Sequence, residues 1–265
     1  MVWPLFKHEL RSCAAPVAVV ACVLALYAGA VVGMFDPELG ESLETMRGAM
    51  PELFAAFGMA DQGSTLLEFL VSYLYGFLLV VFPLALAAML TDRLMVRRIE
   101  QGSISYLLAQ PVGRARLATS QLLVMTSCLI ALMAVMGAVE YACAEALFPG
   151  ELAAADLLAI NVSTLCLWSF LAGICWLSAC ALPGTAAARW AGAAICIAFV
   201  LTEMASGVGE GLAWLGDVTP LALFDPLGVV SGEAGALAGS TILALAGIAL
   251  ASVGTAAFCR RDFSV

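Results

Sequence analysis

Long stretches of the chain contain almost only apolar residues, and the charged residues gather between them. Each stretch reaches the length of about 20 residues that a helix needs to cross the about 30 Å hydrocarbon core of a bilayer. The six stretches cover about residues 14–34, 66–90, 117–142, 157–182, 186–206 and 236–258. The pattern predicts an all-α, polytopic membrane protein with six transmembrane helices. These helices and their connections use nearly the whole chain, so residues 1–265 are expected to form a single transmembrane domain.

Composition leads to the same conclusion. Hydrophobic residues make up 63% of the chain, charged residues 12%, and the mean hydropathy is +1.03. A soluble core of this size cannot bury so much apolar surface, so the lipid bilayer is the expected solvent. The net charge of -9 repels nucleic acid, which is therefore not an expected partner.

Basic residues indicate the orientation, because Lys and Arg accumulate in cytoplasmic loops. In the six-helix arrangement, only Arg47 falls on the opposite side from the other basic residues. Those on the common side are Lys7, Arg11, Arg93, Arg97, Arg98, Arg114, Arg116, Arg189, Arg260 and Arg261. The distribution predicts cytoplasmic termini in a multi-pass protein of a plasma or inner cell membrane.

The N-terminal residues 3–13 form an amphipathic pattern before the first span. One helical face would carry Trp3, Phe6, Leu10 and Cys13, and the other Lys7, His8, Glu9 and Arg11. This pattern predicts an elbow helix that lies in the membrane interface.

The inner loop between the second and third spans, residues 91–116, predicts a short helix of its own. Gly102 can end the helix that extends the second span, and Ser103 can cap a new one that stops before Pro111. Ile104 and Leu107, with Leu108, would form a small apolar face on that helix. The face could enter a groove on a partner protein, or it could rest on the membrane interface.

Several segments in a fixed order resemble the type-2 permeases of ATP-binding-cassette (ABC) transporters. One of them is residues 97–103, Arg-Arg-Ile-Glu-Gln-Gly-Ser, followed by 107–114, Leu-Leu-Ala-Gln-Pro-Val-Gly-Arg. Similar segments are 6–11, 50–58, 219–226 and 258–263. The chain departs from the family pattern at Ile104, Ser105 and Gln121, where that family commonly has an acidic residue after the Gly-Ser pair and a lysine entering the third span.

The resemblance implies a transmembrane subunit of an exporter that works with a separate ABC ATPase subunit. It also implies a homodimer, or a heterodimer with a related permease, and a coupling loop that contacts the ATPase. The candidate coupling residues are Arg97, Arg98, Glu100, Gly102, Ser103, Ile104, Leu107, Leu108, Pro111 and Arg114. Gly29 and Gly33, with Ala25, give the first span a small-residue surface that could serve either the dimer or packing within the chain.

The sequence contains few of the residues that catalytic sites need. A phosphate-binding loop needs Gly-Lys-Ser/Thr, but Lys7 is the only lysine and stands outside any such motif, so ATP is expected on the partner subunit. His8 is the only histidine, which argues against zinc protease and haem sites, and no cofactor or metal is expected on this chain. The chain is therefore not expected to be an enzyme by itself.

Three acidic residues within or beside the spans leave other functions open. Glu68, Glu140 and Glu203 could mark an ion pathway, although their places near the outer span ends favour side chains that reach the outer surface. The alternatives to an ABC permease are an ion-coupled secondary transporter and a non-catalytic membrane scaffold.

The outer stretch 207–235 is too long and too apolar for a plain loop. Pro220 and Pro226 break any single helix there, while Trp214 and Phe224 would be poorly placed in water. A partly re-entrant pair of short helices explains both features, and the resemblance implies that such a segment lies near an extracellular gate. The alternative is a cap that packs on the outer helix ends.

Overall fold

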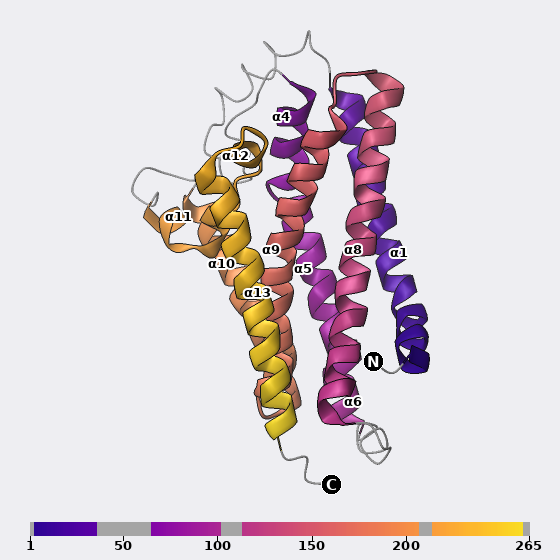
Figure 1. Ribbon diagram of the computed structural model, residues 1–265, viewed down its shortest axis with the longest axis vertical. Helices are drawn as coiled ribbons and strands as arrows, with labels where there is room; N and C mark the ends of the chain where they lie inside the picture. The colour runs from indigo at the N-terminus through magenta and orange to yellow at the C-terminus, as the bar shows by residue number, and fades with distance from the viewer. Residues whose placement is uncertain (1–2, 36–64, 102–112, 207–213, 262–265) are drawn as a thin grey trace.

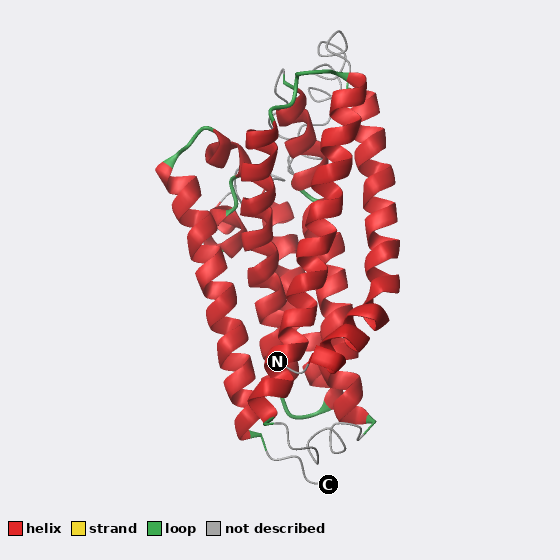
Figure 2. Cartoon of the chain, turned by 45° about the vertical axis from the view of Figure 1, so that its right-hand side comes forward, coloured by secondary structure: helices red, strands yellow, loops and turns green. Residues whose placement is uncertain are grey.

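The computed structural model describes residues 3–35, 65–101, 113–206 and 214–261, and nearly all of this part is helical (Figure 1). Six helical segments are long and apolar enough to cross a membrane, which confirms the predicted all-α fold with six transmembrane helices. They are α1 (Trp3–Met34), the composite segment Leu66–Glu100, α8 (Arg114–Leu147), α9 (Ala154–Ala181), α10 (Thr185–Ser206) and α13 (Ala234–Arg260). The helices lie side by side in one elongated bundle (Figure 2).

The observed helices contain the predicted spans but extend beyond most of them. Only Leu182 of the predicted spans falls outside, because α9 ends at Ala181. At the opposite extreme, α8 continues past its predicted span at both ends, from Arg114 to Leu147. Hydropathy marks the apolar part of a helix, whereas the backbone hydrogen bonds continue into charged residues that can face water. We call the end of the bundle that carries Arg114, Arg189 and Arg260 the basic end.

The second span is a series of helical pieces rather than one uniform helix. Its pieces are α4 (Leu66–Leu70), the π-helix η2 (Val71–Tyr75), α5 (Leu78–Thr91), the π-helix η3 (Asp92–Val96) and α6 (Arg97–Glu100). Regular helical geometry stops between η2 and α5, where Phe77 has φ −132° and ψ −53°. The π-helical turns change which side chains lie on the same face, and such turns are frequent at functional sites.

Pro83 lies inside α5 and explains one contact with a neighbouring helix. Proline has no backbone N–H, so the carbonyl oxygen of Leu79, four residues earlier, loses its helical donor. The indole Nε1 of Trp168 in α9 donates to that oxygen at 2.5 Å, and Trp168 is only 2% exposed. A neighbouring helix thus satisfies the carbonyl group that the proline leaves free, as the apolar interior requires.

Helix α9 is the centre of the bundle and contacts α5, α8, α10 and α13. Its closest neighbour is α13, because glycines face each other at the crossing. A Cβ atom on Gly173 would lie 2.7 Å from the carbonyl oxygen of Gly247, and one on Gly247 would lie 2.6 Å from the backbone of Ser169. On another side of α9, a Cβ on Gly192 of α10 would lie 2.7 Å from the Cα of Cys175. Small residues therefore set the spacing of three helices.

The N-terminal part of α1 turns away from the axis of the rest of the helix, as the segment next to the N label shows (Figure 2). Pro16 lies inside α1 and is the residue type that bends helices. The predicted elbow is therefore the beginning of one continuous helix rather than a separate helix, and its place in the membrane interface stays a prediction. Farther along, α1 packs against α8, where the Cβ position of Gly29 lies 3.8 Å from Sγ of Cys143. At Gly29 the small-residue surface thus serves packing within the chain.

Three short helices follow α10: α11 (Trp214–Val218), the 3-10 helix η5 (Pro220–Leu223) and α12 (Pro226–Val230). Pro220 and Pro226 each begin a helix, and Asp225 caps α12 by accepting from the N–H of Gly228 at 2.9 Å. The sequence predicted a pair of short helices in the stretch 207–235, and its described part contains three. Trp214 is 61% exposed, whereas Phe224 is half-buried against the core, and η5 contacts α10 and α13. Their depth in a bilayer stays a prediction.

The glycine contact between α9 and α13 gives the first testable prediction. Replacing Gly247 with Ala places a methyl group against the backbone of Ser169, so the helices must separate, at a cost of about 1–3 kcal/mol. Gly235→Ala in the same helix is the matched control, because nothing lies within 4 Å of its Cβ position. Thermal unfolding in detergent should show a loss of stability for G247A alone. Equal stability of the two variants would contradict the described crossing.

Candidate functional site

The structure describes both ends of the predicted coupling loop but not its middle. Arg97, Arg98 and Glu100 lie in α6, and Arg114 begins α8. The remaining candidates lie outside the described residues: Gly102, Ser103, Ile104, Leu107, Leu108 and Pro111. The short helix and its apolar face therefore stay predictions, and the site is built from the residues on either side of the loop.

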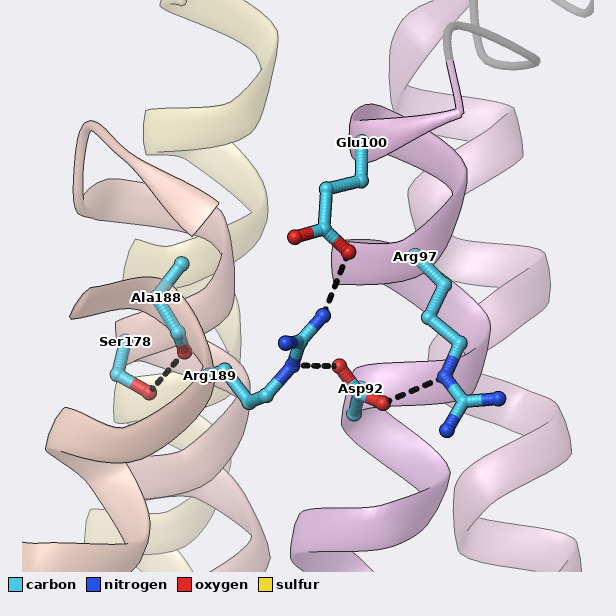
Figure 3. A network of polar contacts seen from close by, with 6 residues as sticks. All are labelled: Asp92, Arg97, Glu100, Ser178, Ala188 and Arg189. Atoms are coloured by element: carbon cyan, nitrogen blue, oxygen red, sulfur yellow. Dashed lines mark hydrogen bonds and ion pairs between the residues drawn. The ribbon is translucent and has the colours of Figure 1, made fainter. Parts of the chain in front are cut away.

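Asp92 is the centre of an ion-pair network at the basic end of the bundle (Figure 3). One carboxylate oxygen accepts from Nε of Arg97 at 2.8 Å, and the other accepts from Nε of Arg189 at 2.6 Å. The π-helical turn η3 explains the first contact, because it brings residues five apart onto the same face and makes the N–H of Arg97 donate to the carbonyl oxygen of Asp92. Asp92 thus joins the end of the second span to α10.

Arg189 extends the network to the last residue of α6. Its Nη2 donates to Oε2 of Glu100 at 2.6 Å, while its Nε is held by Asp92. In Figure 3 the guanidinium of Arg189 lies between the two carboxylates, with Arg97 on the far side of Asp92. Positive and negative groups therefore alternate across the cluster. A polar recess of about 510 Å³ is lined by these four residues together with Gln101 and Trp190.

Helix α1 is tied to the same end of the second span. Glu9 forms an ion pair with Arg98, and Ser12 accepts a hydrogen bond from Nη2 of Arg93 at 2.8 Å. Glu9 is 3% exposed, so the sequence-based assignment of Glu9 to the polar, outward face of the elbow is wrong. The sequence pattern reflects local polarity alone, whereas Arg98, a partner distant in sequence, reduces the cost of burying the Glu9 carboxylate.

The other end of the loop contacts the end of α13. Nη1 of Arg114 donates to the carbonyl oxygen of Arg261 at 2.9 Å and to that of Cys259 at 3.5 Å. Cys259 lies in the last turn of α13 and Arg261 is its C-cap residue, so both carbonyls lie where helical donors run out and a cation is favourable. The two ends of the loop are thus held to three helices: α1 and α10 before it, and α13 after it.

Asp92, Arg189 and Glu9 were not among the candidate site residues. The sequence placed Arg189 on the same side as the coupling loop, which is a correct but weak signal. The sequence signal at Asp92 is stronger, because a carboxylate immediately after an apolar run that ends near residue 90 indicates a functional position. Its pairing with Arg189 could not be found from the chain, since 97 positions separate them.

The three acidic residues of the spans have different surroundings. Glu68 closes a capping box with Thr65 at the start of α4, which is a structural role at a helix end. Glu203 accepts a hydrogen bond from the hydroxyl of Thr219 and so joins α10 to the short helices that follow it. Both residues fit the expected positions near span ends. Glu140 does not, because its side chain is fully buried rather than turned toward the outer surface.

Glu140 belongs to a buried polar group with Tyr75 and Asn161. The hydroxyl oxygen of Tyr75 lies 2.6 Å from Oε2 of Glu140 and 2.7 Å from Oδ1 of Asn161. One hydroxyl proton can serve only one of these two oxygens. A neutral Glu140 would supply the missing proton, because its carboxyl group could donate to Tyr75 while Tyr75 donates to Asn161. Oε1 of Glu140 has no partner among the described residues, which costs less for a neutral carboxyl than for a carboxylate.

The comparison with known families matches almost the whole chain. The family model described as the C-terminal domain of the multidrug efflux system permease Rv1217c matches residues 11–259. This range includes the coupling-loop ends, the ion-pair network apart from Glu9, and the six spanning segments apart from the ends of α1 and α13. No curated protein matches the chain, and no solved structure matches it.

The proton arrangement at Glu140 can be tested by substitution. Glu140→Gln keeps a donor for Tyr75, so its free energy of unfolding should stay within about 1 kcal/mol of the original protein. Glu140→Ala removes the donor and leaves a cavity, which should cost about 1–3 kcal/mol or more. Unfolding in detergent measures both variants. If E140Q lost as much stability as E140A, the result would contradict a neutral Glu140 and indicate a charged carboxylate in the folded protein.

Proposed function

The chain belongs to the multidrug efflux permease family whose model matches it, and on that premise we propose that it is the transmembrane subunit of an ABC exporter. The chain is a multi-pass membrane permease, because it belongs to this family and has six helices able to cross a membrane. The proposal adds the type-2 permease class, a separate ABC ATPase subunit as the partner, and cytoplasmic termini. The chain itself would bind no ATP and catalyse no reaction.

The observation that carries the proposal is the attachment of the loop 102–112 to the bundle. Arg98 and Glu100, just before the loop, pair with Glu9 of α1 and Arg189 of α10. Arg114, just after it, holds the end of α13. A partner that moved the loop would therefore displace three helices that are distant in sequence. A connection that merely linked two spans would not need such contacts.

The network is suited to transmitting movement rather than to adding stability. The Arg189 side chain is 29% exposed, that of Glu100 39% and that of Arg97 61%, and ion pairs exposed to this degree contribute about 0–1 kcal/mol each. Their geometry is nevertheless specific, because Arg189 uses two different nitrogens for two carboxylates. The pairs can therefore hold α10 in register with α6 at little energetic cost to a rearrangement.

Two features of the sequence support a separate ATPase. Lys7 is the only lysine, so this chain cannot supply the lysine that contacts phosphates in a P-loop. The segments around the loop also resemble those of type-2 permeases, as described above. In this arrangement Ile104, Leu107 and Leu108 would enter a groove on the ATPase, and the ion-pair network would pass the resulting movement to α1, α10 and α13.

Dimerisation and an outer gate complete the proposal. The chain would form a dimer with itself or with a related permease, and the substrate path would follow the interface. Gly33 has nothing within 4 Å of its Cβ position, so this part of the small-residue surface on α1 is open to another helix. The outer residues Trp214, Pro220, Phe224 and Pro226 would lie near the extracellular gate.

An ion-coupled transporter is the second candidate, because Glu140 is fully buried in a spanning helix. Tyr75 accounts for one of its oxygens, and a neutral carboxyl would complete the hydrogen bonds that run from Glu140 through Tyr75 to Asn161. This arrangement also suits a structural role. Transport that depends on ATP hydrolysis, rather than on an ion gradient, would distinguish the first candidate from the second.

The partner is tested by purification of the complete chain together with a co-expressed P-loop ATPase from the same transport system. Leu107→Asp would place a charge in the proposed groove and should abolish co-purification, because an unpaired buried charge costs several kcal/mol. Arg116→Ala is the control, since Arg116 is exposed and lies outside the proposed groove. Failure of the original chain to retain any such ATPase would exclude the proposed function. Unchanged retention by L107D would exclude the loop as the main contact.

Coupling is tested separately with Arg189→Ala. This variant loses both ion pairs that join Arg189 of α10 to the second span but keeps the loop itself, so the ATPase should still co-purify. Transport-coupled ATP turnover in reconstituted vesicles should fall by about tenfold, which corresponds to about 1.4 kcal/mol of lost coupling. R116A should retain normal turnover. Full transport by R189A would show that the network does not transmit movement.

A further inference from the structure

A lateral groove opens between α8, α9 and α13, away from the ion-pair network. Each of these helices contacts the other two, and α9 lies between α8 and α13 (Figure 1). The groove has a volume of about 370 Å³, within the range of pockets that hold small organic ligands. Trp168 and Ala172 of α9, both buried, form its floor.

The rim of the groove faces outward from the bundle. Ile130 of α8, Val162 of α9 and Ile248 of α13 line the groove and are 52%, 58% and 61% exposed. In a chain whose long helices cross a membrane, a face with such exposed apolar side chains meets lipid. A molecule dissolved in the bilayer could therefore reach the groove from the side.

Helix geometry places the groove well inside the length of the spanning helices. Leu122 follows the first residue of α8 by eight positions, and Ser252 precedes the last residue of α13 by eight. At 1.5 Å per residue, both lie about 12 Å from the basic end. Ile130 and Ala244 are eight residues farther along, at about 24 Å. The groove thus occupies the depth at which the surroundings are hydrocarbon.

The lining offers no charge and little free hydrogen-bonding capacity. None of the residues that line the groove is charged. Its three hydroxyl groups each donate to a carbonyl of their own helix: Thr126 to Leu122 at 3.0 Å, Ser169 to Cys166 at 2.7 Å and Ser252 to Ile248 at 2.7 Å. The indole N–H of Trp168 donates to Leu79. A ligand would therefore gain from apolar contact and from the aromatic ring.

From these observations we infer that the lateral groove is an entry site for uncharged, apolar small molecules that the permease takes from the bilayer. The inference names a substrate class and rests on the proposed efflux function. An ion would lose its hydration without gaining a partner, so permanent cations are excluded from this site. Uncharged aromatic compounds fit best, because Trp168 offers a ring in an otherwise aliphatic pocket.

Binding is tested on the purified permease in nanodiscs, without an ATPase, using benzophenone as an uncharged photoreactive probe. After illumination, peptide mapping should place the labels on α8, α9 and α13 around the groove. Excess diphenylmethane should compete, whereas tetraphenylphosphonium, a permanent cation, should not. Uniform labelling of every membrane-facing helix, insensitive to diphenylmethane, would reveal an ordinary lipid-contacting surface and overturn the inference.

Filling the groove provides the matched variants. Ala244→Phe and Ser252→Phe each add a phenyl ring to the lining and should reduce labelling by about tenfold, because the ring occupies the volume that the probe needs. Ala249→Phe is the control, since Ala249 is exposed on α13 but does not line the groove. Two filling variants keep the test valid if one fails to fold. Unchanged labelling in a folded filling variant would refute the site.

Transport distinguishes this inference from the proposed function. In cells that contain the complete transporter, A244F should lower the efflux of an uncharged aromatic dye by about tenfold. ATPase co-purification should be unaffected, because the groove lies about 12 Å or more from the basic end. Normal efflux by A244F would remove the entry role while leaving the ABC assignment intact. Loss of the ATPase from the original chain would remove that assignment while leaving probe binding measurable.

Discussion

The contact between α9 and α13 is the constraint on which the rest of the structure depends. Gly173 and Gly247 let the two backbones approach to a distance at which any added side-chain atom would collide. In a membrane, apolar side chains gain little from leaving lipid for a helix interface, so close packing and hydrogen bonds must hold the helices together. With α13 fixed on one side, α9 presents Trp168 to the second span and Cys175 to α10. Both helices that form the ion-pair network are therefore positioned by α9.

The network at the basic end follows from this packing. Pro83 leaves the carbonyl of Leu79 free, Trp168 binds it, and this contact fixes α5 against α9. Gly192 brings α10 equally close to α9, which places Arg189 near the end of α5. The π-helical turn η3 then aligns Asp92 with Arg97, so one carboxylate serves two arginines. Exposed ion pairs would be weak in isolation, but helices that are already fixed lose little further freedom when they form.

Some buried positions hold polar side chains where apolar side chains would be more stable. Glu140 leaves one oxygen without a partner, and both amide atoms of Gln121 are buried with none among the described residues. Such groups reduce stability, so their presence at buried positions is a physical reason to test them for a role in movement. The lateral groove shows the opposite arrangement. Its hydroxyls are satisfied within their own helices, which leaves a surface suited to apolar molecules.

The sequence by itself determined the helical fold and the six spans, because a run of about 20 apolar residues has no other stable state in a bilayer. The resemblance of its segments to type-2 permeases also predicts a coupling role for the residues on both sides of the loop 102–112, and that role stays a prediction. The sequence did not reveal that Glu9 is buried, that Glu140 avoids the outer surface, or that Asp92 pairs with Arg189. Each depends on a partner from another helix, and helix faces are chosen by contacts between distant segments. The local pattern fixes where a helix runs, whereas only tertiary packing decides which charges meet.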